Sequence, residues 1–85
     1  MAIATEILKP DPIEQYVIEK VRKLREEKNL RQRDIAEILN ITASFVGNVE
    51  NTRNPAKYNL KHIGMLCKFF RVPPSYFLPE SYFDL

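Results

Sequence analysis

QRDIAEILNITASFVGNVEN, residues 32–51, contains two short amphipathic patterns that are separated by a turn signal. In its first half the apolar residues recur at helical spacing and predict a helix over 32–39. These apolar residues are Ile35, Ala36 and Leu39. Asn40 follows, in the place where a helix commonly ends with a residue in the left-handed conformation. The chain is therefore expected to turn at Asn40.

The second half of this stretch opens with Ile41 and Thr42. We expect Ile41 to plug the core, and the Thr42 hydroxyl can accept a hydrogen bond from a backbone N–H two or three residues later. Val46 and Val49 then predict a helix over 43–51. Two short helices joined by such a turn form a helix-turn-helix, whose second helix has about the right width to enter a DNA major groove.

An amphipathic pattern on the N-terminal side of this unit predicts a helix over 16–28. Val17, Val21, Leu24 and Leu30 lie on or near one helical stripe. Asn29 follows the last basic residue of this helix, in the place of a left-handed C-terminal residue, so the chain is expected to turn there. Residues 1–14 contain two prolines and show no sustained periodicity, which predicts a flexible arm. We therefore expect an arm over 1–14, a helix-turn-helix domain over 15–79 and an apolar tail over 80–85.

The C-terminal side begins with a loop, because Asn54-Pro55 favours extended or turn geometry. A second amphipathic stripe then predicts a helix over 60–70. It consists of Leu60, Ile63, Leu66, Cys67 and Phe70. Pro74 suits the start of a short last helix over 75–78. No strand is indicated, so the predicted fold is an all-α domain of five helices.

The composition excludes several classes of protein. The chain has 85 residues, with a single histidine, His62, and a single cysteine, Cys67. A lone cysteine allows neither an internal disulfide nor a cysteine-based zinc cluster, and no second ligand lies at metal spacing from His62. No stretch approaches the apolar length of a membrane span. We therefore expect a cytoplasmic protein that is no enzyme, needs no cofactor or metal and does not enter a membrane.

The net charge of +2 is distributed unevenly along the chain. Residues 17–71 contain twelve basic and six acidic side chains, whereas the segments before and after them are acidic. This basic centre modestly favours a polyanionic partner such as double-stranded DNA.

The segment VIEKVRKLREEKNLRQRDIAEILNITASFVGNVENTRNP, residues 17–55, closely resembles the Cro/Xre-type helix-turn-helix repressors of phages and bacteria. With the stripe of the 60–70 helix included, the resemblance covers about residues 17–78. It implies a five-helix, lambda-repressor-like domain. It also implies a sequence-specific DNA-binding transcriptional regulator, with repression as the expected sign of regulation.

The resemblance assigns roles to individual residues. The positions expected to read bases are Ala43, Ser44, Phe45, Gly47 and Asn48. The positions expected to lie near or clamp the DNA backbone are Gln32, Thr42, Asn51, Arg53 and Lys57. Glu50 is expected to be structural and to pair with Arg25. Gly47 weakens its helix, and a close approach of that helix to DNA would explain the glycine.

The small, nearly neutral surface of the 43–51 helix leaves two interpretations open. In the first, Asn48 contacts an adenine edge while Ser44, Ala43 and Phe45 add smaller contacts. In the second, base specificity is weak and binding depends on cations at phosphates. These cations are Arg31, Arg33, Arg53 and Lys57.

The last residues add an apolar surface made of Tyr82, Phe83 and Leu85. Such a patch on a small domain suggests an interface, and related repressors dimerise through this end. Two-fold pairing would set two recognition helices about 34 Å apart, one turn of DNA. We expect a homodimer, with packing of the tail on its own domain as the alternative.

A rival class of function keeps the same scaffold and binds a protein, as an antitoxin-like or adaptor subunit would. This class would use Phe45 and the aromatic tail, and the apolar character of the 43–51 helix supports it. Neutralising basic side chains separates the two classes, because only a DNA binder should lose affinity. The substitutions concern Arg31, Arg33 and Arg53.

Overall fold

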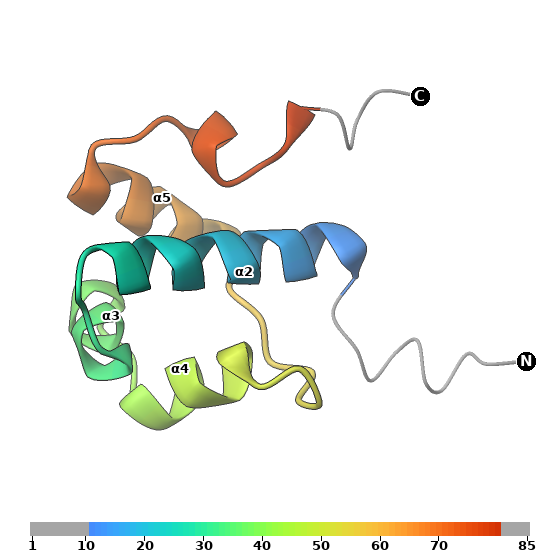
Figure 1. Cartoon of the computed structure of the whole chain (residues 1–85), viewed down its shortest axis with the longest axis vertical. Helices are drawn as coiled ribbons and strands as arrows, with labels where there is room; N and C mark the ends of the chain where they lie inside the picture. Colours follow the sequence, from blue (N-terminus) through green and yellow to red (C-terminus); the bar gives the residue numbers. More distant parts are fainter. Residues whose placement is uncertain (1–10, 81–85) are drawn as a thin grey trace, which may run out of the picture.

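The computed structural model describes residues 11–80, which form four α-helices and one short 3-10 helix, with no β-strand among them. In chain order the elements are α2 (Pro12–Glu27), α3 (Gln32–Leu39), α4 (Ala43–Glu50), α5 (Leu60–Phe70) and η1 (Pro74–Tyr76). In Figure 1, α2 crosses the middle of the molecule, with α4 below it and η1 above it. The all-α fold class is thus confirmed. None of these helices is both long enough and apolar enough to cross a bilayer.

Among the described residues the first helix is α2, which begins at Pro12, four residues earlier than the apolar pattern predicted. The Glu14 carboxylate accepts a hydrogen bond from the Asp11 backbone N–H at 2.9 Å, and Pro12 takes the first helical position, which needs no N–H donor. The assignment of residues 12–14 to a flexible arm is therefore wrong, because capping extends the helix beyond its apolar stripe. The rest of the predicted arm, residues 1–10, lies outside the described residues.

Three left-handed residues lie at the ends of helices: Asn29, Asn40 and Arg71. The turns predicted at Asn29 after α2 and at Asn40 after α3 are confirmed. Asparagine tolerates this conformation better than most residues because its short polar side chain bonds locally. Arg71 lacks that advantage, and the sequence offered no sign that α5 would end in the same way.

The predicted fifth helix over 75–78 is a single 3-10 turn, η1. Pro73 and Pro79 bracket this segment, and because proline cannot continue a helix, there is no room for further turns. A fifth α-helix is therefore absent from the described residues. Phe77 follows η1 directly and is completely buried, so this short element still closes the core.

The core receives apolar side chains from all four α-helices. Its buried members are Val17, Ile18, Val21, Leu24, Ile35, Ala36, Leu39, Val46, Val49, Tyr58, Ile63, Leu66 and Phe77. Every apolar position predicted to face inward on α3 and α4 is among them. The two short helices are thus held by one continuous core, which fixes how α4 is presented.

Leu60 is the exception to the stripe predicted for α5. Its residue surface is 83% exposed, whereas Ile63 and Leu66 on the same stripe are buried. Leu60 is the first residue of α5 and lies one turn before the first buried position, at the margin of the core. Helical spacing predicts which side chains share a face, but it does not predict where the covering elements stop.

Candidate nucleic-acid interface

The turn between α3 and α4 is built by local hydrogen bonds. Asn40, with a φ of 56°, ends α3, and the Ile41 backbone N–H donates to the Ala36 carbonyl at 2.9 Å. The Thr42 hydroxyl oxygen then accepts a hydrogen bond from the Phe45 backbone N–H at 3.1 Å, which starts α4. Both ends of the turn are therefore defined by residues that the sequence had singled out.

One face of α4 is exposed and carries three of the five predicted base-reading positions. Ala43, Ser44 and Asn48 are exposed, while Val46 and Val49 on the opposite side are buried. Positions 43, 44, 47 and 48 fall on one side of a helix that turns by 100° per residue. The exposed face is small and polar, with one carboxamide that can pair with a base edge.

Phe45 does not belong to this exposed face, so its predicted role in base reading is not supported by its position. It is half-buried against the core, and its ring stands edge-on to the His62 imidazole, with the ring centroids 6.1 Å apart. Phe45 precedes Val49 by four residues and therefore extends the inward stripe of α4. That spacing was the signal in the sequence that could have placed Phe45 inside.

A largely buried ion pair anchors the C-terminal end of α4. Arg25 donates two hydrogen bonds to the Glu50 carboxylate, each of 2.9 Å, and a third of 2.9 Å to the Leu30 carbonyl. The Glu50 side chain is only 6% exposed. The expected pairing of Glu50 with Arg25 is therefore confirmed. A bidentate pair of this kind fixes orientation as well as charge, so it sets α4 relative to α2.

Gln32 joins this ion pair from the start of α3. Its side-chain amide N–H donates to a Glu50 carboxylate oxygen at 3.1 Å. The amide oxygen of Gln32 lies over Gly47, where a Cβ atom would stand only 3.3 Å from it. Gly47 thus has a reason within the protein: it leaves room for the Gln32 side chain. The predicted explanation by close approach to DNA is not needed.

The helix-turn-helix unit and the helix after it match a known protein family. A family model described as Helix-turn-helix matches residues 21–77, which include α3, the turn, α4 and α5. The chain belongs to the Cro/Xre-type helix-turn-helix family. No curated protein and no solved structure gives a significant match. The match assigns the chain to a family of DNA-binding domains and supports a DNA-binding regulator.

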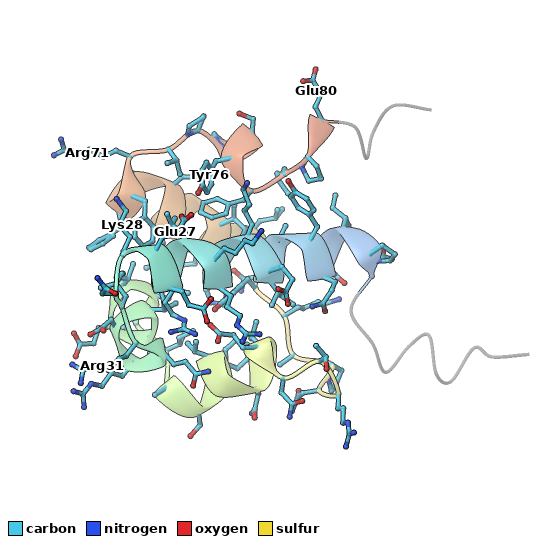
Figure 2. All side chains as sticks on the ribbon, viewed as in Figure 1. Glu27, Lys28, Arg31, Arg71, Tyr76 and Glu80 are labelled. Atoms are coloured by element: carbon cyan, nitrogen blue, oxygen red, sulfur yellow. The ribbon has the colours of Figure 1, made fainter. Side chains whose placement is uncertain are left out.

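The helix-turn-helix domain carries exposed basic side chains at the start of α3 and shortly after α4. Arg53 is exposed in the turn that follows α4, and its backbone N–H donates to the Asn51 side-chain oxygen at 3.0 Å. Arg31 projects into solvent at the start of α3 (Figure 2) and lies 3.7 Å from the Asp34 carboxylate. Arg53 and Asn51 therefore lie together directly after the exposed helix.

Lys57 was also predicted to contact phosphates, and it forms an ion pair within the helix-turn-helix domain. Its ammonium group lies 2.9 Å from the Glu14 carboxylate, at the N-terminal end of α2. Burial raises the pKa of Glu14, but the hydrogen bonds from Lys57 and from the Asp11 backbone outweigh it, so the net pKa is lowered. This ion pair offsets the charge that Lys57 would otherwise present to a phosphate.

His62 connects α4 to the segment before α5. Its Nδ1 atom accepts a hydrogen bond from the Asn59 backbone N–H at 3.1 Å, and its ring packs edge-on against Tyr58 as well as Phe45. Burial, followed by the charge of Lys61, lowers the pKa of His62. No pattern in the sequence predicted this contact of His62 with α4.

Proposed function

We propose that this helix-turn-helix domain is a sequence-specific transcriptional regulator that places α4 in the major groove of double-stranded DNA. The observation that carries the proposal is the exposed face of α4. It is held by the ion pair of Arg25 with Glu50, and it is followed at once by Arg53. A rigid helix with a solvent-facing polar surface and adjacent cations suits base reading combined with phosphate contact.

Asn48 is the proposed main base reader, because a carboxamide can make two hydrogen bonds to an adenine edge. Ser44 can donate or accept, and the Ala43 methyl group can contact a thymine methyl. Gln32, Thr42 and the residues after α4 are proposed to lie along phosphates. Phe45 and Gly47 are left out of the base-reading set, since both contact other parts of the domain.

Two further parts of the proposal concern how the domain acts. Repression requires only that a bound domain occupies a site that the transcription machinery needs. A homodimer on a palindromic site would place two α4 helices about 34 Å apart. The tail predicted to mediate this pairing, residues 81–85, lies outside the described residues.

Selection from a random DNA pool at several salt concentrations tests the proposal. We expect enrichment of a palindrome with half-sites about ten base pairs apart. Asn48→Ala should weaken binding to the selected site by about 1–3 kcal/mol and relax one position. Arg53→Ala should weaken all sequences alike and reduce the salt slope by about 1.

The matched control is Lys68→Ala, which removes an exposed cation from α5. It should leave both the selected sequence and the salt slope unchanged. Binding without enrichment would contradict base reading and leave only phosphate contact. An absence of binding near physiological salt would contradict the proposed function.

Protein binding is the second candidate function, and the side chains that support it differ from those expected from the sequence. Phe45 gives it little support, because its ring is half-buried and stands edge-on to His62. Phe69 supports it instead, since this large apolar residue is 57% exposed. Neutralising the cations of α3 and the loop after α4 should leave such partner binding unchanged.

A further inference from the structure

An apolar groove of about 460 Å³ lies on the domain, between the first turns of α2 and the start of α5. Its apolar walls are Ile13, Val17, Leu60, Ile63 and Leu78. The ion pair of Glu14 with Lys57 stands at its edge. None of the residues proposed to read bases contributes to this groove.

Leu60 is exposed although apolar side chains surround it in the groove. A leucine that is 83% exposed at the edge of an apolar groove leaves a contiguous apolar surface open to water. Such surfaces on small domains are sites of association, because covering them removes apolar area from water. The groove is therefore a surface that requires an apolar occupant.

We propose that residues 81–85 of the same chain, SYFDL, occupy this groove and cover Leu60. The described chain passes through the groove wall at Leu78 and ends at Glu80, so the next residues start beside it. Phe83 is five residues beyond Leu78, a reach of about 17 Å in extended form. Tyr82, Phe83 and Leu85 supply the apolar side chains that the groove lacks.

Attachment to the same chain favours occupation of the groove by the chain's own tail over occupation by the tail of a second copy. A short tether gives the tail an effective concentration on the order of millimolar at its own groove. A second copy at micromolar concentration is about a thousandfold more dilute. The tail therefore covers the groove of its own domain rather than that of a second copy. This assignment does not depend on DNA binding.

A disulfide trap in the full chain tests the assignment. In a Cys67→Ser background, Leu60→Cys combined with Phe83→Cys should oxidise rapidly to a product of monomer mass without free thiols. The control pair, Phe69→Cys with Phe83→Cys, uses the exposed apolar residue at the other end of α5 and should not close. Covalent dimers would assign the groove to a second copy, and closure no faster than the control would overturn the proposal.

Truncation provides an independent readout in the chain without cysteine substitutions. Deletion of residues 81–85 should lower Tm by about 5–10 °C, since apolar cover is lost. Deletion of residues 1–10 should leave Tm within about 2 °C. The reverse pattern would assign the groove to the N-terminal segment and overturn the proposal.

Discussion

The two ends of this helix-turn-helix domain are stabilised in different ways. Where α4 meets α2 and α3, a buried carboxylate gathers hydrogen bonds from Arg25 and Gln32 within 3.1 Å. Where α2 meets the start of α5, an apolar groove stays open and Leu60 is exposed. Charged, directional contacts fix one orientation, whereas apolar contacts accept any fitting surface. The first end suits the presentation of a reading helix, and the second suits an added segment.

The largest expected effect comes from removing the ion pair between Arg25 and Glu50. Glu50→Ala should lower the free energy of unfolding by about 3–5 kcal/mol, because it removes two of the three hydrogen bonds made by the largely buried Arg25 guanidinium. Urea unfolding at low temperature measures this loss. The double variant Arg25→Met with Glu50→Met removes both charges and should be more stable than Glu50→Ala alone. If Glu50→Ala lowers the free energy of unfolding by less than about 1 kcal/mol, the ion pair does not fix the orientation of α4.

Gly47→Ala tests the charged end of the domain in a second way, because it should affect the orientation of α4 for DNA binding more than the stability of the fold. The new methyl group would displace the Gln32 side chain, while alanine gains up to about 1 kcal/mol of helix propensity. We expect stability within about 1 kcal/mol of the parent but DNA affinity reduced about five- to tenfold. Thermal unfolding and DNA titration of the same samples measure the two quantities.

Gly64→Ala is the matched control for this substitution. An added Cβ at Gly64 meets no atom within 4 Å, so the variant should gain up to about 1 kcal/mol and bind DNA normally. Equal DNA affinities for the two alanine variants would contradict the assigned role of Gly47.

The smallest expected effect concerns His62, which contacts Phe45 of α4 and Tyr58 before α5. Because its pKa is lowered on folding, the folded state favours neutral imidazole, whose Nδ1 accepts a hydrogen bond. The resulting stability is present above the unfolded pKa of about 6.5 and is lost as pH falls through the lower, folded value. Tm should therefore drop between pH 7.5 and pH 5.5. His62→Gln should flatten this drop, and an unchanged slope would rule out His62 as its source.

Much of the fold could be predicted from local signals in the sequence. Asn29 and Asn40 end their helices as expected, and Thr42 caps α4. The signal for the early start of α2 was also present, as an acidic cap at Asp11 followed three residues later by Glu14. It was missed because the apolar stripe begins later.

Tertiary position accounts for the side-chain placements that the sequence did not predict. Periodicity placed Leu60 on the right stripe but could not show that no described element covers it. The resemblance placed Phe45 among base readers, although packing against His62 turns it inward. Gly47 is explained by Gln32, fifteen residues earlier in the chain, and no local pattern predicts such a contact.

The exposed α4 face also has a consequence for how such a domain can diversify. Ala43, Ser44 and Asn48 are exposed, and none of them belongs to the core or to the carboxylate network. Substitutions at such exposed positions alter folding stability little. If α4 docks as proposed, the domain can therefore acquire a new operator through these three codons alone, without compensating changes elsewhere.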